Sequence, residues 1–405
     1  MQRTRLIAIA ALGAGLAVVV GLYGTPGWQV GRVALVGAGT VAAIAGARRH
    51  EGAGWDLALA AIGTVGAAIG LGLMYLRLKH AVTDALSAPG LVVLVAGAVL
   101  AATSALRLLR RLRGWRKVPA AIGIALAGVV TVYVVAIPVA ATTAPRAAPG
   151  TATPAASGVA YRDVGFTTGD GLRLSGWYLP TRSGAGVVMV AGSSSTRLAA
   201  LDQAVALNRE GFGVLLFDAR GHGRSEGRAM ELGWYGAGDV SAAVGELAGM
   251  PGMDPARVGA VGFSKGGEEV LGAMASDPRI RAGVAEGATG RQRDDKAWLA
   301  SRYGPAGRLQ QVLDTAVFGL TDLLNDTGPP TPLRRAVAAS APRPVLLIVA
   351  GLIADEQHAA AWMRSGSPDS VTVWVADGAG HVGAFAHDPR RWTDTVTRFL
   401  DAALA

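Results

Sequence analysis

A serine at position 264 lies in the segment Gly262-Phe263-Ser264-Lys265-Gly266, which fits the pattern G-x-S-x-G. The apolar run Val258–Phe263 precedes this serine, and the helix-like stretch Glu268–Ala275 follows it. The pattern predicts a tight turn between a buried strand and a helix, with small residues two positions before and after the serine to avoid clashes. Such a turn exposes the hydroxyl near a helix N-terminus, whose dipole favours the negative charge that develops in acyl transfer. Ser264 is thus the candidate nucleophile.

A serine nucleophile needs a base, and His381 has a suitable position for that role. It ends the loop Asp377-Gly-Ala-Gly-His381, directly after the last predicted strand, Val371–Ala376. The competing histidines belong to another motif or are expected on surface helices; they are His222, His358 and His387. We therefore expect the imidazole of His381 to take the proton of the serine hydroxyl.

Two adjacent carboxylates, Asp355 and Glu356, follow the predicted strand Pro344–Ala350. Either could hold the imidazole in the required tautomer and stabilise the imidazolium. The alternative role is structural, because Asp at an N-cap and Glu in a first turn both stabilise the start of a helix. One of the two is expected to cap the helix while the other orients His381, and the sequence does not rank them.

An oxyanion hole needs two backbone N–H groups near the substrate carbonyl. Lys265, which follows the nucleophile, is expected to supply one of them. The second is expected from the loop Gly192-Ser193-Ser194-Ser195, with Ser193 the best candidate.

The segments that must position these groups alternate between short apolar runs and amphipathic helices. Eight strands are predicted, the first two as a hairpin around Thr-Gly-Asp-Gly: Tyr161–Thr168, Leu172–Leu179, Gly186–Ala191, Gly213–Phe217, Val258–Phe263, Ile280–Ala285, Pro344–Ala350 and Val371–Ala376. The alternation indicates an α/β fold with a mostly parallel sheet covered by helices on both faces. The segment Arg291–Ala341 interrupts the alternation and is interpreted as a cap over the site.

The run Asp218-Ala-Arg-Gly-His-Gly-Arg-Ser225, together with Gly262–Gly267 and Gly378–His381, resembles the α/β-hydrolase superfamily in its serine-aminopeptidase and monoacylglycerol-lipase-like branch. The resemblance covers roughly residues 160–405. It implies that Asp218 and His222 have an architectural role. The sequence departs from the family pattern in two places: Ala191-Gly192 replaces the usual His-Gly before the oxyanion loop, and Gly-Leu-Ile-Ala-Asp-Glu replaces the commoner Gly-x-x-Asp.

The composition assigns part of the chain to a membrane. Among 405 residues, 51% are hydrophobic and only 17% are charged, which is unusual for a soluble enzyme. Residues 1–158 hold 14 Lys and Arg against 3 Asp and Glu, whereas residues 159–405 hold 24 against 26. Because the excess positive charge belongs to the hydrophobic half, it is typical of loops between membrane spans and not of a nucleic-acid groove. The absence of cysteine excludes disulfide and thiolate chemistry.

Five apolar stretches of about 18–24 residues are each long enough to cross a hydrocarbon layer of ~30 Å. They are Leu6–Gly24, Gln29–Ala47, Leu57–Leu76, Pro89–Leu106 and Val118–Ala141. Small residues are expected to let these helices pack closely, the candidates being Ala38, Ala42, Gly63, Ala67, Gly97 and Ala101. Asp56 lies near the end of a span and is expected to reach the interface.

The basic loops predict the orientation of these spans. The N-terminus, the loop with Arg48 and Arg49, and the loop 107–117 carry most of the Lys and Arg and lie on one side if there are five spans. The positive-inside rule makes that side cytoplasmic, so an odd number of spans places the C-terminal domain outside.

The expected organisation is a membrane region at 1–141, a Thr/Ala/Pro-rich linker at 142–158 and an α/β-hydrolase domain at 159–405 with a cap at 291–341. The expected function is a membrane-anchored serine hydrolase that cleaves an ester, thioester or amide through an acyl-enzyme. Its substrate is expected to be a small-molecule or lipid-like acyl compound, and this chemistry requires no metal or organic cofactor. Two alternatives stay open: a catalytically silent binding or sensing module, and an acyltransferase that uses the same residues.

Overall fold

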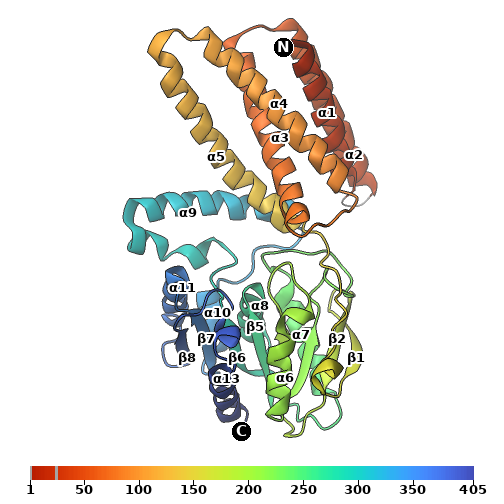
Figure 1. The fold of residues 1–405 in the computed structure, drawn as a ribbon, viewed down its shortest axis with the longest axis vertical. Helices are drawn as coiled ribbons and strands as arrows, with labels where there is room; N and C mark the ends of the chain where they lie inside the picture. Colours follow the sequence, from red (N-terminus) through yellow and green to blue (C-terminus); the bar gives the residue numbers. More distant parts are fainter. Residues whose placement is uncertain (1, 23–25) are drawn as a thin grey trace. The chain divides into compact units, whose positions relative to one another are not determined.

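The computed structural model describes residues 2–22 and 26–405, which fall into two compact units (Figure 1). The first unit consists of Met1–Pro145 and Val312–Asn325, and the second consists of Arg146–Gln311 and Asp326–Ala405. A segment that is late in the sequence therefore belongs to the unit formed by the N-terminal region.

Five helices, long and apolar enough to cross a membrane, form the N-terminal part of the first unit. They are α1 (Gln2–Gly21), α2 (Pro26–Arg49), α3 (Ala53–Lys79), α4 (Ser87–Arg111) and α5 (Lys117–Thr142). The predicted number of apolar helices is thus confirmed. The end predicted for the first of them, at Gly24, lies outside the described residues.

Helices α3 and α4 approach closely at glycines. A Cβ added to Gly63 would lie 2.8 Å from the carbonyl oxygen of Gly97, and a Cβ added to Gly97 would lie 2.8 Å from the carbonyl oxygen of Gly63. Both distances are too short for real side chains, so the contact depends on residues without a Cβ. Ala38 and Ala42 differ from the expectation, because both are exposed on α2.

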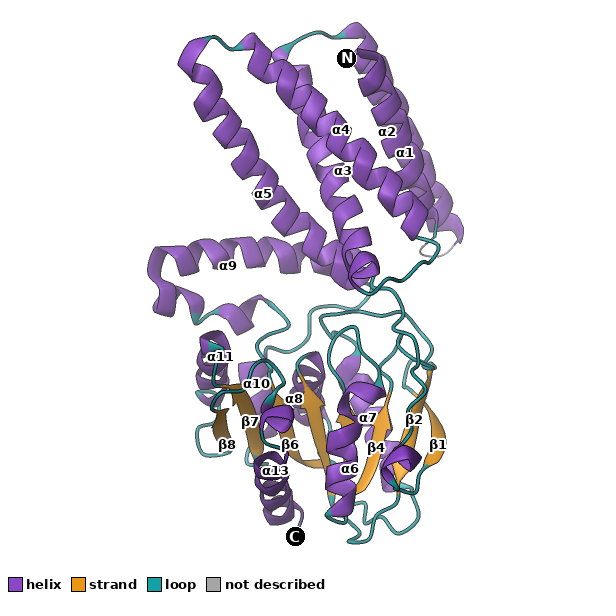
Figure 2. Cartoon of the chain, in the orientation of Figure 1, coloured by secondary structure: helices purple, strands orange, loops and turns teal. Residues whose placement is uncertain are grey.

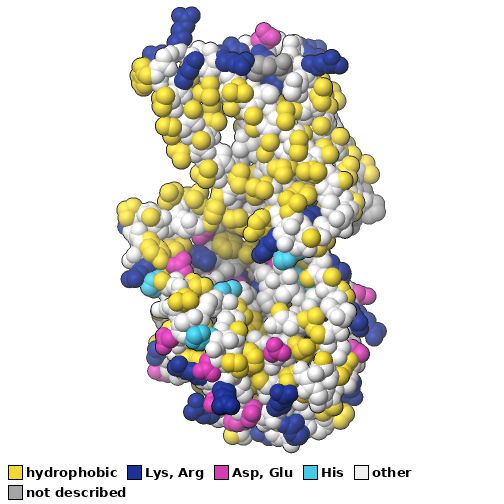
Figure 3. Space-filling model, in the orientation of Figure 1, with side chains coloured by type: hydrophobic (Ala, Val, Ile, Leu, Met, Phe, Trp, Pro, Cys, Tyr) yellow, Lys and Arg dark blue, Asp and Glu magenta, His cyan; other side chains and the backbone are white. Residues whose placement is uncertain are grey.

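Lys and Arg side chains are concentrated at one end of this helical unit, the end that carries the N-terminus (Figure 3). Asp56, expected near the end of a span, is buried among these side chains and is 2% exposed. Its carboxylate lies 2.9 Å from Arg5, 3.4 Å from Arg107 and 3.0 Å from Arg111. These three guanidinium groups compensate the negative charge of a buried carboxylate, which would be costly without such partners.

The second unit contains one mixed sheet with the strand order β1-β2-β4-β3-β5-β6-β7-β8. The strands are β1 (Arg162–Thr167), β2 (Arg173–Leu179), β3 (Gly186–Val190), β4 (Gly213–Phe217), β5 (Val258–Phe263), β6 (Ile280–Glu286), β7 (Val345–Ala350) and β8 (Val371–Ala376). Strand β2 pairs antiparallel with β1 and β4, and all other pairs are parallel. Every predicted strand is present, with bounds within one residue of those expected.

Helices cover both faces of this sheet (Figure 2). One core layer includes side chains from α7 (Gly236–Ala248), α8 (Lys265–Ser276), α10 (Leu333–Ser340) and α11 (Ala354–Arg364). The opposite layer includes side chains from α6 (Leu201–Arg209), α12 (Ala384–His387) and α13 (Pro389–Leu404). Adjacent strand residues such as Val187 and Val188 enter different layers because side chains alternate along a strand.

The segment between β6 and β7 forms α9 (Leu299–Leu324) and α10. Helix α9 bends at Gly304, whose φ of 56° and ψ of −130° are not helical, and a new helical segment starts at Pro305. A glycine tolerates this conformation, and proline fits the first position of a helix because its missing N–H would have no partner there.

A larger residue at Gly97 tests the close contact between α3 and α4. Gly97→Leu forces the two helices apart and is expected to destabilise the protein by about 1–3 kcal/mol, the usual cost of overpacking. The matched control is Gly128→Leu on α5, because a Cβ added to Gly128 meets nothing within 4 Å. Thermal unfolding of the full chain in detergent measures both, and equal midpoints for the two variants would contradict the packing described above.

Candidate active site

Ser264 joins the end of β5 to the start of α8 in a strained conformation, with φ 53° and ψ −121°. The neighbouring glycines make room for this turn. A Cβ added to Gly262 would collide with the carbonyl of Gly266, and one added to Gly266 would lie 2.6 Å from the carbonyl oxygen of Ala191. The structure therefore gives both small residues the steric reason expected from the sequence.

The hydroxyl of Ser264 is within hydrogen-bond distance of the predicted histidine. Its Oγ lies 2.9 Å from Nε2 of His381. The other ring nitrogen, Nδ1, lies 2.6 Å from Oε1 of Glu356. Serine, histidine and carboxylate thus form a continuous chain of hydrogen bonds, the arrangement that lets a histidine accept a serine proton.

Glu356, not Asp355, is the carboxylate that reaches His381. Glu356 is 1% exposed, and its Oε2 accepts a hydrogen bond of 2.8 Å from the backbone N–H of Ala350. Asp355 is exposed and accepts a hydrogen bond of 2.6 Å from the hydroxyl of Tyr303. Both carboxylates lie in the first turn of α11, where successive residues point about 100° apart, so only one can face the histidine.

The hydrogen bond from His381 to the carboxylate of Glu356 raises the pKa of the imidazole above its ordinary value of 6.5. The negative charge of Glu356 stabilises the imidazolium. This effect is larger than that of partial burial, which lowers the pKa. The histidine loop is also strained, since Val382 has a φ of 52°.

One edge of the imidazole packs against the backbone at Gly287, directly after β6. A Cβ added to Gly287 would lie 3.0 Å from Cε1 and 3.1 Å from Nδ1 of His381. Gly287 also has a φ of 71°, a region that favours glycine.

Lys265 and Ser193, the residues predicted to form an oxyanion hole, both lie near Ser264. Lys265 is the first residue of α8, where the N–H groups have no partner within the helix. The loop with Ser193 lies beside the nucleophile, because a Cβ added to the preceding Gly192 would lie 3.3 Å from Cβ of Ser264. The Ser193 hydroxyl donates a hydrogen bond of 2.9 Å to the carbonyl oxygen of Glu231.

Glu286, at the end of β6, is a site residue that the sequence analysis missed. Its backbone carbonyl accepts a hydrogen bond of 2.7 Å from the N–H of Ser264. Its buried carboxylate accepts hydrogen bonds from the N–H of Ala384 at 3.0 Å and from the indole N–H of Trp392 at 2.9 Å. Burial raises the pKa of this carboxyl. Glu286 therefore links the nucleophile turn to the segment after His381. A carboxylate ending a buried apolar strand was the only signal in the sequence.

The Asp218–Ser225 run has the architectural role that the resemblance implied. The carboxylate of Asp218 is buried and accepts hydrogen bonds from the backbone N–H and the guanidinium of Arg197 at 2.8–3.1 Å. His222 is fully buried, with Nδ1 3.0 Å from the carbonyl oxygen of Arg220 and Nε2 3.2 Å from Glu231. Both side chains are occupied in holding the loop.

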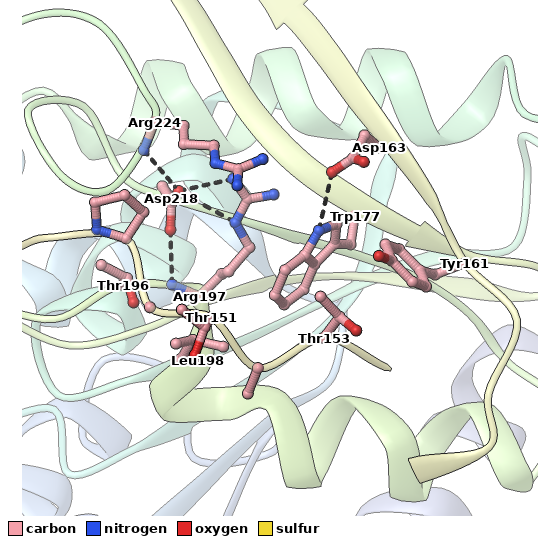
Figure 4. Close-up of a pocket in the computed structure, with 13 residues that line it drawn as sticks. Thr151, Thr153, Tyr161, Asp163, Trp177, Thr196, Arg197, Leu198, Asp218 and Arg224 are labelled. Carbon is pink, nitrogen blue, oxygen red and sulfur yellow. Dashed lines mark hydrogen bonds and ion pairs between the residues drawn. The ribbon is translucent and has the colours of Figure 1, made fainter. Parts of the chain in front are cut away.

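A separate hollow of about 450 Å³ lies where residues 149–153 cross the second unit (Figure 4). Its walls include Trp177, Arg197 and Asp218, whereas neither Ser264 nor His381 lines it. Part of the predicted linker 142–158 contacts the domain here, because the carbonyl of Ala147 accepts a hydrogen bond of 2.9 Å from the N–H of Gly223 in the loop after β4. Among the described residues, no group of three or more His, Asp or Glu could hold a metal ion.

Gly287→Ala tests the support of the imidazole. The methyl group presses on the ring of His381, and because displacements near 1 Å can reduce catalysis by about a hundredfold, we expect a loss of that order in the rate at which a phosphonate labels Ser264. Gly171→Ala is the matched control, since Gly171 also has a positive φ (87°) but faces open space. Equal rates in the two variants would show that the contact with Gly287 does not position the histidine.

No family model matches the chain. An uncharacterized protein of Mycobacterium tuberculosis (strain ATCC 25618 / H37Rv) is 42% identical over 130 residues, which cover 31% of this chain and 46% of that protein. A thiohydrolase of Aspergillus aculeatus is 35% identical over 125 residues (30% and 39%), and a polyketide transferase of Penicillium sp is 33% identical over 185 residues (43% and 57%). The chain spans about half the length of these curated relatives.

Among solved structures, an esterase of Pyrococcus furiosus superposes with a TM-score of 0.52 and 26% identity, over 64% of this chain and 98% of the esterase. That similarity agrees with the strand order, the turn at Ser264 and the position of the histidine loop after β8. The C-terminal domain has the α/β-hydrolase fold, and five long apolar helices precede it among the described residues.

Proposed function

We propose that the protein is a membrane-anchored serine hydrolase that cleaves an ester, thioester or amide bond. The single observation that supports this most strongly is the chain of hydrogen bonds from Ser264 through His381 to Glu356, with distances of 2.9 and 2.6 Å. Similarity to an esterase favours a hydrolytic activity in general.

In the proposed mechanism, Oγ of Ser264 attacks the carbonyl carbon of the substrate while Nε2 of His381 takes the hydroxyl proton. The tetrahedral intermediate collapses, the bond to the leaving group breaks, and the leaving group receives that proton. Water then attacks the acyl-enzyme with His381 again as the base, which releases the acid and restores the serine. Glu356 keeps the imidazole oriented and stabilises its positive charge throughout, without itself being protonated.

We assign the negative charge on the tetrahedral oxygen to the backbone N–H groups of Lys265 and Ser193. Both belong to the backbone next to Ser264, and α8 adds its N-terminal dipole. Each such donor contributes substantially, since the loss of one typically costs a factor of about 10²–10³ in rate.

An acyltransferase is the second candidate. The matched polyketide transferase of Penicillium sp favours it, because the same acyl-enzyme can be resolved by an alcohol or amine in place of water. Product analysis with added alcohols or amines separates the two activities.

We further propose that α1 to α5 cross a membrane and that the hydrolase domain lies outside the cytoplasm. The length and composition of these helices support the first point, and the gathered basic residues support the second. The proposed substrate is a small-molecule or lipid-like acyl compound, and the mechanism calls on protein groups alone.

Labelling of intact cells with a membrane-impermeant, serine-reactive phosphonate tests nucleophile and orientation together. We expect labelling of the wild-type chain and its complete loss in Ser264→Ala, because the phosphonate reacts with the serine whose hydroxyl is hydrogen-bonded to His381. Ser276→Ala, at the end of α8, is the control and should label normally. Labelling of Ser264→Ala would disprove the nucleophile, and labelling only after lysis would disprove the orientation.

The pH dependence of kcat/KM tests which carboxylate, Glu356 or Asp355, acts on His381. Only neutral His381 accepts a proton, so activity rises with pH through its pKa, and this rise is expected above pH 6.5 because Glu356 raises that pKa. Glu356→Gln removes the stabilising charge and should move the rise to lower pH while reducing the plateau by about a hundredfold or more. Asp355→Asn, whose carboxylate binds Tyr303 instead, should leave the profile in place. A shift in Asp355→Asn but not in Glu356→Gln would reverse the assignment.

A further inference from the structure

The second part of α9 belongs to a different unit from the strands that flank it in the sequence. Helix α9 lies between β6 and β7 of the hydrolase domain, yet residues Val312–Asn325 belong to the unit of the five apolar helices. This part of α9 and α5 lie next to each other in Figure 1.

One face of this segment is buried, and a hydrogen bond joins it to α5. Asp314, Val317 and Thr321 are 7%, 4% and 0% exposed, and they follow one another at the spacing of one helix face. The carboxylate of Asp314 accepts a hydrogen bond of 2.8 Å from the hydroxyl of Tyr133 on α5. The segment is therefore attached to a helix that is itself proposed to cross the membrane.

The opposite face of the segment is apolar and uncovered. Val312 is 67% exposed and Leu323 is 80% exposed, and the small residues Ala316 and Gly319 between them are exposed too. These four residues are spaced by four, three and four positions, so they form one stripe along the helix without a charged side chain. Such a stripe is unusual on a surface that faces water.

We propose that this stripe lies in the bilayer interface and contacts lipid acyl chains. The proposal rests on the membrane anchoring proposed above. Its main support is continuity with α5, whose own uncovered face is apolar, with Leu126 and Val129 62% and 67% exposed. Tyr133 lies nine residues before the end of α5 at Thr142, a distance of about 14 Å along a helix, so the contact with α9 is in the half of α5 that ends at Thr142.

The occupant we infer is lipid and not a second protein chain. A helix that lies flat in the interface turns an apolar face toward the acyl chains, and residues 312–324 present such a face. The exposed apolar side chains of α5 are in the layer where lipid would already surround the protein.

Single-cysteine spin labels test this placement, because the full chain contains no cysteine and each introduced thiol is labelled alone. The probes are Val312→Cys and Leu323→Cys on the stripe, Leu126→Cys on α5, and Asp401→Cys on the exposed side of α13. The full-length protein is reconstituted in vesicles of phosphatidylcholine and phosphatidylglycerol, and collision rates with oxygen and with a water-soluble nickel complex are measured.

We expect oxygen to collide more often than nickel at positions 312, 323 and 126, and the reverse at 401. Nickel collisions at 312 and 323 as frequent as those at 401 would overturn the inference, and so would protection of both labels from both reagents, which would show protein covering the stripe. If the label at 126 is also in water, the proposed membrane anchoring fails. If only 312 and 323 are in water, the anchoring stands and the docking of α9 alone is wrong.

Discussion

Ser264 has a φ of 53° and a ψ of −121°, a conformation that costs a residue with a side chain on the order of 1–3 kcal/mol. It persists because the structure fixes both ends of the turn. The Ser264 N–H donates to the carbonyl of Glu286 on the neighbouring strand at 2.7 Å, and the Ser264 carbonyl accepts from the N–H groups of Gly267 and Glu268 at 2.9 and 3.2 Å. The sheet and the helix thus balance the local strain. Every other group of the site is placed relative to this turn.

Two buried glutamates position the histidine and the segment that follows it. Glu356 binds the imidazole itself, whereas Glu286 binds the backbone and the tryptophan that follow it. Both carboxylates have hydrogen-bond donors on each oxygen, which compensates for their removal from water. The loop of His381 is therefore fixed from two sides by charge, and from a third side by the backbone at Gly287.

Much of the hydrolase domain could be predicted because buried parallel strands are short apolar runs with recognisable breaks. Ser264 and His381 could be found for the same reason, since each follows such a run directly. The choice between Asp355 and Glu356 could not be made, because it depends on the rotation of α11 about its axis, and one residue of phase decides which carboxylate faces inward.

Three other features could not be predicted from the sequence. Glu286 was missed because a single carboxylate at a strand end has no distinctive pattern. The burial of Asp56 could not be predicted because nothing in its span shows that arginines from two other helices would surround it. The partner of residues 312–325 is also invisible, since helical periodicity gives the apolar face but not the surface on which it packs.

The division of α9 between the two units means that the backbone passes from one unit to the other three times: after Pro145, after Gln311 and after Asn325. The hydrolase domain is consequently not a simple appendage. Cutting the chain once at residue 146 would release a fragment that still carries 312–325, with Asp314 deprived of its hydrogen bond from Tyr133. A soluble, compact version of this catalytic unit would therefore need the β6–β7 insertion shortened in addition to removal of the N-terminal helices.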